Sequence, residues 1–324
     1  MIPIADIHEA AGRIGPHIVR TPLTEDAQAH LWLKWENRQT TGSFKLRGAL
    51  NKVLAQSDQA RARGLVAASA GNHGQGVAHA ARLLPAHVRV FTYAHAVKEK
   101  VAAMRELGAE VVAVEGGYGE AEAAAIADAH ASGRLWVSPY NDELVIAGQG
   151  TIALEIVDEL GPLERATVWV PAGGGGLAAG IGSAIRALRP RWRVVAAQSV
   201  ASAYLHAHFH GRAMESVNEQ ESLADGLAGP VEQGSLTLDL VREVVDDFVL
   251  VEEQAVAQTI GEAWWLYGER IEGSAAVALA AARQNAGARG GANIVIVSGG
   301  NVSSETHSQI CARWGQAAVT RRVV

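Results

Sequence analysis

The sequence has little of several residues and patterns that mark large classes of protein. Its one cysteine, Cys311, can form neither an internal disulfide nor a thiolate metal cage. Aspartate and glutamate (34) outnumber lysine and arginine (28), and the net charge of −6 gives no general attraction for nucleic acid. No apolar run approaches the ~18–20 residues of a membrane span, and the N-terminus lacks the apolar stretch of a signal peptide. We therefore expect a soluble, cytoplasmic protein without nucleic-acid or membrane partners.

The chain is instead rich in apolar residues (48%) and contains 35 glycines in 324 residues, above the usual ~7%. This apolar share can bury a sizeable core, and the length suits one large domain or two moderate ones. The glycines are clustered rather than periodic, which excludes collagen and points to tight loops that hold ligands.

A short β-branched run, a glycine-containing turn and an alanine-rich segment with helical spacing recur along the chain. Apolar runs without alternation are typical of strands covered on both faces, as in parallel sheets with crossover helices. The sequence therefore predicts an α/β fold, and its length predicts two open parallel-type sheets with a cleft between them. The predicted strand and helix pairs are residues 64–69 with 74–84, 88–93 with 97–107, 110–114 with 120–131, 166–170 with 177–188, 193–197 with 202–211, and 293–297 with 303–314.

Three glycine-containing turns follow predicted strands, where open α/β sheets place their ligands. They are the SAGNHG loop (residues 69–74), the glycine loop (residues 173–176) and the SGGN loop (residues 298–301). Four consecutive glycines before a helix let several backbone N–H groups point at one anion, and the helix dipole adds to the attraction. We therefore interpret the glycine loop as a phosphate site rather than a merely flexible turn.

The same region also has the G-x-G spacing of a dinucleotide site, at Gly174, Gly176 and Gly180. Such a site needs an acidic residue near the end of the next strand, about 20 residues on, for the ribose hydroxyl. Here that strand ends at Gln198 and Ser199, without an acid. A nicotinamide cofactor is therefore disfavoured.

The segment TTGSFKLRGA, residues 40–49, places Lys45 in a glycine- and serine-rich turn. Followed in order by the SAGNHG, glycine and SGGN loops, it resembles the pyridoxal-phosphate (PLP) enzymes of fold type II, specifically the threonine/serine dehydratase and serine racemase family. The resemblance runs from near the N-terminus to about residue 300. Further matching segments are RTPL (20–23), KWEN (34–37), PYN (139–141), GQGT (148–151) and ADGL (224–227).

The resemblance implies two α/β domains with the cofactor in the cleft between their sheets. A large PLP-binding domain is expected from residues 1–50 and 143–324, with a smaller domain, residues 51–142, inserted in it. The resemblance also suggests a homodimer that acts on a small amino-acid substrate.

It further implies a role for each matching residue. Lys45 would be the internal Schiff-base lysine, Asn72 the partner of the cofactor's phenolic oxygen, and Ser298 the partner of its pyridine nitrogen. Phe44 would pack against the ring, and the glycine loop would hold the phosphate. The cofactor contacts expected in this way are Phe44, Lys45, Asn72, Gly173, Gly174, Gly175, Gly176, Leu177, Glu272, Ser298 and Gly299, and the substrate contacts are Ser69, Ala70, Gly71, Asn72, His73 and Gly226.

These residue types suit the chemistry. Partial burial lowers the pKa of an ammonium, so Lys45 can be neutral and act as nucleophile and then as base at the substrate Cα. A serine at the pyridine nitrogen, unlike a carboxylate, holds no proton there. The ring is then a weaker electron sink, which suits prompt β-elimination over a long-lived carbanion.

Three features depart from the family pattern or allow two interpretations. Family racemases have a serine at the position of Ala70 as a second acid/base, so the alanine favours elimination over racemisation. Glu272 is followed by glycine instead of the common proline; it is either a carboxylate of the site or a helix N-terminal acid favoured by the dipole. We interpret the pairs Trp264–Trp265 and Trp32/Trp35 as core or subunit contacts rather than stacking surfaces for a substrate.

Metal binding is not expected. The positions that hold a divalent cation in metal-binding relatives read Gln198, Ser202 and Tyr204 here, and hard cations need anionic oxygens. The sequence leaves open a monovalent ion held by carbonyls. On a helix His206 and His210 would share a face and His208 would point away, which fits a solvated face better than a metal site.

The sequence thus predicts a PLP-dependent dehydratase, or ammonia-lyase, that converts a β-hydroxy α-amino acid such as L-threonine or L-serine to a 2-oxo acid and ammonia. The alternatives are a dehydratase of a bulkier 3-hydroxy amino acid (phenylserine, hydroxyaspartate or a product of hydroxyectoine breakdown), an amino-acid racemase, and a non-catalytic PLP-binding protein. The segments 225–235 and 139–141 are expected to shape the side-chain pocket.

Overall fold

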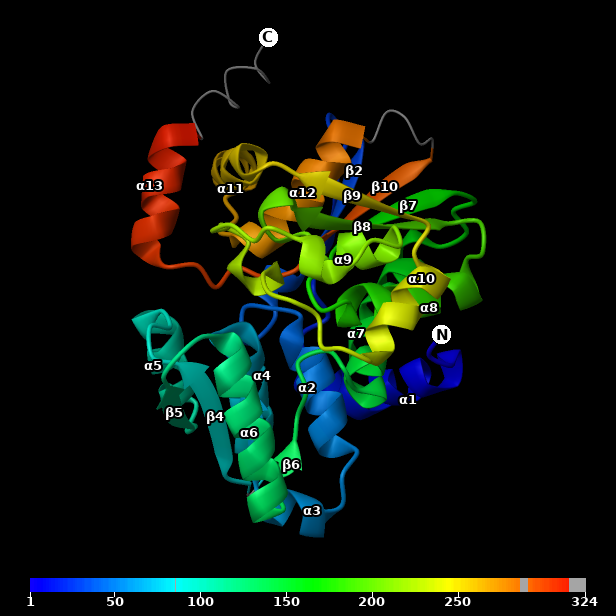
Figure 1. Ribbon diagram of the computed structural model, residues 1–324. Helices are drawn as coiled ribbons and strands as arrows, with labels where there is room; N and C mark the ends of the chain where they lie inside the picture. Colours follow the sequence, from blue (N-terminus) through cyan, green and yellow to red (C-terminus); the bar gives the residue numbers. More distant parts are fainter. Residues whose placement is uncertain (85, 286–290, 315–324) are drawn as a thin grey trace.

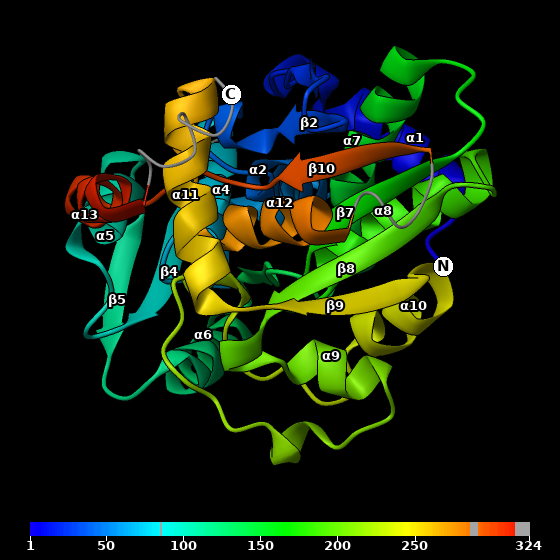
Figure 2. The ribbon, with the colours of Figure 1, turned by 90° about the horizontal axis from the view of Figure 1, so that it is seen from above.

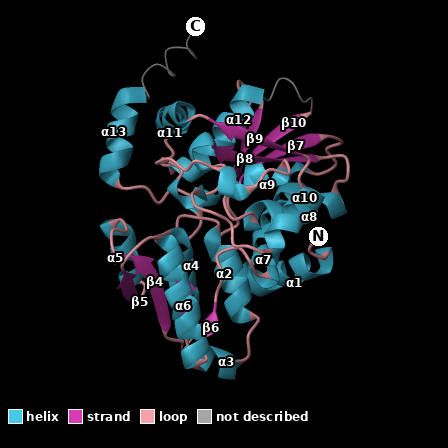
Figure 3. Cartoon of the chain, in the orientation of Figure 1, coloured by secondary structure: helices cyan, strands magenta, loops and turns pink. Residues whose placement is uncertain are grey.

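The computed structural model describes residues 1–84, 86–285 and 291–314, which fold around two sheets (Figures 1 and 3). The strands are β1 (Leu23–Asp26), β2 (Leu31–Trp35), β3 (Leu65–Ala68), β4 (Val88–Tyr93), β5 (Glu110–Val114), β6 (Leu135–Trp136), β7 (Ala166–Pro171), β8 (Arg193–Ser199), β9 (Asp247–Val251) and β10 (Ala292–Val297). The larger sheet has the order β1-β2-β10-β7-β8-β9, and the smaller one β5-β4-β3-β6.

Helices flank both sheets. The α-helices are α1 (Ile4–Ile14), α2 (Lys45–Leu54), α3 (Asp58–Ala62), α4 (Asn72–Arg82), α5 (Lys98–Glu106), α6 (Tyr118–Ser132), α7 (Glu143–Leu160), α8 (Gly176–Leu188), α9 (Tyr204–Phe209), α10 (Leu236–Val244), α11 (Glu253–Tyr267), α12 (Gly273–Asn285) and α13 (Ser304–Trp314). Short 3₁₀ turns include η3 (Val200–Ser202) and η5 (Asp225–Leu227). Within the described residues no helix is long and apolar enough to cross a membrane.

The central strands of the larger sheet are covered on both faces. Val168 of β7 packs in a core with α7 and α8, whereas the next residue, Trp169, packs in a second core with α11 and α12. Figure 2 shows α12 lying across β7 and β8. Because both faces are covered, β7, β8 and β10 are apolar without alternation. Only the edge pair β1 and β2 is antiparallel among the paired strands described.

The smaller sheet is parallel throughout its described strands. Leu65 and Val90 face a core with α2 and α4, whereas Val66 and Phe91 face α6 on the opposite side. We call this sheet with α4, α5 and α6 the small lobe (residues 65–136), and the larger sheet with its helices the large lobe. The small lobe lies inside the range 51–142 expected for an inserted domain.

The predicted α/β fold is confirmed, with two sheets of parallel type. Each predicted strand lies within two residues of an observed one, and Gly108 ends its helix with φ +91° as a helix stop requires. The helix predicted over residues 202–211 is shorter than expected, because η3 occupies its first part and α9 covers only Tyr204–Phe209.

Candidate active site

Lys45 begins α2 and points at the segment before α7. Its Nζ donates a 2.8 Å hydrogen bond to the carbonyl oxygen of Pro139, and it lies 5.2 Å from the centre of the Phe44 ring. Burial lowers the pKa of Lys45 to about 8, although the charge of Glu272 works in the opposite direction. A larger fraction of this amine is therefore neutral near pH 7 than of an ordinary lysine.

The glycine loop is packed too tightly for side chains. A Cβ on Gly173 would lie 2.8 Å from the Cα of Leu227, and one on Gly174 would lie 2.3 Å from the Tyr140 ring. Gly175 has φ +87°, which strains any other residue type. No side chain caps the N-terminus of α8 that follows. The loop thus joins close-packed backbone to an uncapped helix end, which suits an anion such as phosphate.

One short segment connects Lys45 to the glycine loop. Pro139 accepts the hydrogen bond from Lys45, and the next residue, Tyr140, contacts both Gly174 and Gly176. The Tyr140 hydroxyl accepts a 2.9 Å hydrogen bond from the backbone N–H of Glu232, which fixes the ring. The amine and the proposed phosphate cradle are therefore neighbours, although more than 120 residues separate them in sequence.

The SGGN loop is attached to the turn that carries Lys45. Ser43 and Gly299 form a β-bridge, and the N–H of Phe44 donates a 3.0 Å hydrogen bond to the carbonyl oxygen of Ser298. Ser298 is buried. The buried Ser43 hydroxyl has no hydrogen-bond partner among the described residues, which leaves one polar atom beside Lys45 for a ligand.

A chain of side-chain amides joins the two lobes at the same place. Asn72 Nδ2, at the start of α4, donates a 2.7 Å hydrogen bond to Glu272 Oε1, just before α12. Asn301 Nδ2 donates to Asn72 Oδ1 and to the carbonyl oxygen of Thr41, at 2.8 Å each. Asn72 is thus held by Glu272 and Asn301, two residues of the large lobe.

Glu272 lies between Asn72 and Gly299. A Cβ built on Gly299 would lie 2.5 Å from Glu272 Oε1. Burial, and then the charge of Asp225, raise the pKa of Glu272 to about 7, while Lys100 and the Asn72 hydrogen bond lower it. Of the two interpretations left open by the sequence, this position favours a carboxylate of the site over a helix-capping acid.

The SAGNHG loop joins β3 to α4 at the same edge. Gly71 N–H donates a 3.0 Å hydrogen bond to the Ser69 hydroxyl, which shapes the loop. His73 Nε2 lies 2.8 Å from the carbonyl oxygen of Val137. Burial, and then the charge of Lys45, lower the pKa of His73 to about 3, so this ring is neutral and bound to backbone. Nε2 of His73 is therefore not available to a substrate.

Two further predicted contacts have a defined place. A Cβ on Gly226, in η5, would lie 2.8 Å from the Ser274 hydroxyl, two residues after Glu272. The Leu177 side chain is buried in the core of the large lobe, so it can offer a ligand only its backbone. The structure thus brings the predicted residues of the SAGNHG, glycine and SGGN loops around Lys45.

Four further residues line this region: Tyr140, Asn301, Lys100 and Asp225. The sequence placed Tyr140 and Asp225 only within the segments 139–141 and 225–235 expected to shape the side-chain pocket, and it assigned no contact to Asn301 or Lys100. Tyr140 and Asn301 lie within the quoted PYN and SGGN motifs, which was the available signal. Lys100 offers no such signal, because a lysine in a helix is usually solvated.

Of the three positions considered for a divalent cation, Ser202 and Tyr204 contact the carboxylate of Glu219. Ser202 Oγ donates a 2.7 Å hydrogen bond to Glu219 Oε1, and Tyr204 OH lies 3.4 Å from its other oxygen. Gln198 Oε1 accepts from the N–H of His206 at 3.1 Å. Among the described residues no group of three or more His, Cys, Asp or Glu side chains could hold a metal ion.

The histidine run follows its predicted helical spacing only in part, because α9 ends at Phe209, just before His210, and His206 and His208 are half-buried rather than solvated. The rings of His206 and His210 lie 4.5 Å apart, and Arg212 approaches His206 Nδ1 at 2.8 Å. Trp35 is a core residue as expected, but Trp264 and Trp265 are 44% and 45% exposed. A core role for that pair is therefore wrong, and a subunit contact stays a prediction.

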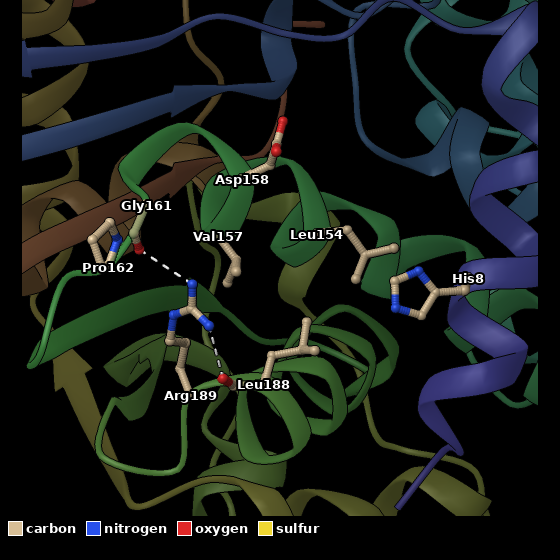
Figure 4. Close-up of a pocket in the computed structure, with 8 residues that line it drawn as sticks. All are labelled: His8, Leu154, Val157, Asp158, Gly161, Pro162, Leu188 and Arg189. Carbon is tan, nitrogen blue, oxygen red and sulfur yellow. Dashed lines mark hydrogen bonds between the residues drawn. The ribbon is translucent and has the colours of Figure 1, made fainter.

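A hollow of about 540 Å³ lies apart from this site, on the outer side of α7 and α8 (Figure 4). Its one arginine, Arg189, donates to the carbonyl oxygens of Leu188 and Gly161 at 3.0 and 3.2 Å. The guanidinium is thus already engaged in capping helix ends, and we assign the hollow no ligand. It is lined by His8, Leu154, Val157, Asp158, Gly161, Pro162, Leu188 and Arg189.

Comparison with known proteins identifies the family. Residues 14–300 match the model of the family described as "pyridoxal-phosphate dependent enzyme". The chain belongs to this family. Within it, the chain is a fold type II member of the threonine/serine dehydratase group.

Individual members of the family match over nearly the whole chain. The L-threonine ammonia-lyase of Geobacter sulfurreducens is 39% identical over 97% of this chain and 79% of its own. The catabolic L-threonine dehydratase of Escherichia coli K12 is 37% identical over 95% of this chain and 96% of its own. The structure of maize serine racemase covers 99% of both chains with a TM-score of 0.85 at 28% identity. The cofactor of this family fits the residues present. The glycine loop leads into a helix whose N-terminus no side chain caps, Lys45 has a lowered pKa, and the Ser43 hydroxyl has no hydrogen-bond partner among the described residues.

Proposed function

We propose that this protein is a PLP-dependent dehydratase, or ammonia-lyase, that converts a β-hydroxy α-amino acid such as L-threonine or L-serine to a 2-oxo acid and ammonia. The observation that carries the proposal is the segment Pro139–Tyr140, which contacts both Lys45 and the glycine loop. It places an amine with a lowered pKa beside a phosphate cradle, as amine exchange with a phosphorylated aldehyde requires.

The residues divide the work as follows. PLP, when bound, supplies an aldehyde for amine exchange and an electron sink for charge at the substrate Cα. The glycine-loop N–H groups bind the phosphate, Phe44 packs against the ring, and Ser298 and Asn72 orient its polar atoms. The SAGNHG loop binds the substrate carboxylate. Lys45 Nζ would take the Cα proton and the β-hydroxyl would leave protonated, so that the elements of water are lost in total; hydrolysis of the released enamine would then give the 2-oxo acid and ammonia.

Ala70 supports elimination rather than racemisation. A racemase needs a second proton donor on the face opposite the lysine, and a methyl group has no exchangeable proton. Since a serine racemase is among the structural neighbours, racemisation remains the second candidate, together with dehydration of bulkier 3-hydroxy amino acids.

A homodimer in the cytoplasm is also part of the proposal. The adjacent exposed side chains of Trp264 and Trp265 offer apolar surface for a second copy. A single, buried, free cysteine is compatible with a reducing compartment.

The test is release of ammonia and 2-oxo acid by the holoenzyme from a panel of 3-hydroxy amino acids. L-Threonine and L-serine are expected to be substrates, and the panel also includes phenylserine and hydroxyaspartate. Lys45→Ala should abolish release, whereas Lys98→Ala, an exposed lysine of α5, should not change it. A holoenzyme that keeps its cofactor spectrum but releases no ammonia from any member would contradict the proposal.

A further inference from the structure

An ion pair crosses from one lobe to the other beside the site. Lys100 Nζ, in the first turn of α5, donates a 2.6 Å hydrogen bond to Asp225 Oδ2, at the start of η5. The two partners are unequally solvated: the side chain of Lys100 is 14% exposed and that of Asp225 is 51% exposed. The lysine is therefore the fixed partner and the aspartate the one that water can release.

Lys100 lies directly on the SAGNHG loop. A Cβ built on Gly71 would come 2.9 Å from Lys100 Cδ and 3.7 Å from its Nζ. A glycine at this position is thus what lets the lysine stem approach the loop backbone. The ammonium consequently stands over the loop expected to bind the substrate carboxylate.

The charge of Lys100 is retained and is felt within the site. Burial works against the ammonium, but the carboxylates of Asp225 and Glu272 outweigh it and raise the pKa of Lys100. Of the other basic side chains described near this loop, Lys45 is proposed to react and His73 is neutral. Lys100 is therefore the cation available to an anionic group on the SAGNHG loop.

We propose that Lys100 is a substrate-binding residue that exchanges its ion pair with Asp225 for an ion pair with the substrate's α-carboxylate. The inference rests on the proposed function and adds a specificity determinant to the same site. Breaking the ion pair with Lys100 costs little free energy on the side of Asp225, because a half-exposed carboxylate is well solvated and exposed ion pairs are weak. A carboxylate seated on the loop gains a charge-assisted hydrogen bond from a partly buried ammonium.

The alternative is that the pair only ties the lobes together. In that case Lys100 and Asp225 would contribute in the same direction, and removing either would weaken ligand binding alike. Under exchange the two residues act in opposite directions, because Asp225 competes with the substrate carboxylate for Lys100.

The experiment titrates holoenzyme with glycine and with glycinamide, followed by the visible spectrum of the bound cofactor. Glycine carries the α-carboxylate but no leaving group, and glycinamide lacks the carboxylate. The ratio of their dissociation constants isolates recognition of the carboxylate from amine exchange. The variants are Lys100→Met, Asp225→Asn and the matched control Lys98→Met, which removes the same charge from an exposed position on α5.

Exchange predicts that K100M raises the dissociation constant of glycine about tenfold or more relative to that of glycinamide. It also predicts that D225N lowers the dissociation constant of glycine severalfold and that K98M changes neither constant. If K100M behaves as K98M does, or if D225N leaves glycine binding unchanged or weaker, the inference is overturned. The cofactor spectrum and thermal unfolding of each variant identify one that fails to fold. Failure of the proposed function is a separate result, because it would show as wild-type holoenzyme that binds glycine but releases no ammonia from any hydroxy amino acid.

Discussion

The side-chain amide of Asn72 donates a 2.7 Å hydrogen bond to the carboxylate of Glu272, across 200 positions of the sequence. It joins the start of α4 in the small lobe to the start of α12 in the large lobe. Because Asn72 is the expected partner of the cofactor's phenolic oxygen, the charge of Glu272 is transmitted to the proposed cofactor site through one amide. This relation makes the protonation of Glu272 the first quantity to test.

The contribution of Glu272 to the stability of the apoprotein should fall as the pH rises through the range in which Glu272 loses its proton. Its pKa is raised from 4.5 to about 7 in the folded chain, so between these values the folded state holds a proton that the unfolded state has released. This group's contribution to the unfolding free energy therefore decreases with rising pH across that window, whereas buried His73, whose pKa is lowered to about 3, contributes in the opposite direction. Chemical denaturation at several pH values should show that the unfolding free energy of wild type minus that of Glu272→Gln decreases as the pH rises across the window. The exposed Glu106→Gln is the control, and an identical slope in all three proteins would contradict the assignment.

Gly174→Ala should weaken PLP binding by at least about tenfold, or about 1.4 kcal/mol. The new Cβ would lie 2.3 Å from the Tyr140 ring, so either the ring or the glycine loop must move. Titration of apoprotein with PLP by absorbance measures the change. Gly119→Ala, where nothing lies within 4 Å of the new Cβ, should bind PLP as wild type does. If the cause is the clash, Tyr140→Ala combined with Gly174→Ala should recover part of the affinity; no recovery would point to another cause.

Ala70→Ser should introduce racemisation. Chiral chromatography of an L-serine reaction should show pyruvate with little D-serine for wild type, and a ratio of D-serine to pyruvate at least about tenfold higher for the variant. The expectation follows because a positioned acid/base group contributes ~10²–10⁴-fold to a proton transfer. A wild-type rate of D-serine formation equal to that of pyruvate would contradict the role assigned to the alanine.

A chelator should leave activity and thermal stability unchanged. The side chains at the positions considered for a cation already have partners within the chain. Ser202 binds Glu219 at 2.7 Å, and Gln198 binds the backbone N–H of His206. Measurements of ammonia release and of the melting temperature with and without chelator check this. A loss of either that magnesium restores would show that a divalent cation does bind.

Much of the fold could be predicted because the core strands carry their own signal. Strands β3, β4, β7, β8 and β10 are short, mostly apolar runs covered on both faces, and β3, β7 and β10 are followed by glycine turns. Strand β2, which lies between the edge strand β1 and β10, carried no such signal: its LWLKW sequence contains Lys34, which is fully buried and paired with Glu155 at 2.7 Å. A charged residue is buried only when a partner from a distant helix is present, and the sequence alone does not reveal that partner.

The site divides in the same way. Lys45 and the three loops are local patterns, so their residues could be named from sequence and resemblance. Tyr140 and Asp225 were expected only as members of two pocket-shaping segments, without named contacts. Lys100 was not expected at all, because it reaches the site only through contacts between elements far apart along the chain. Trp264 and Trp265 show the converse: of the two roles expected for them, core or subunit contact, the core role is excluded because both lie exposed on α11.

The identity of the amine that holds PLP is the most direct test of this account. Hydride reduction of the holoenzyme fixes the cofactor to that amine, and peptide mapping by mass spectrometry then locates it. We predict the modification on Lys45 and its loss in Lys45→Ala. A modification on another lysine, or none with the cofactor fully bound, would contradict the account.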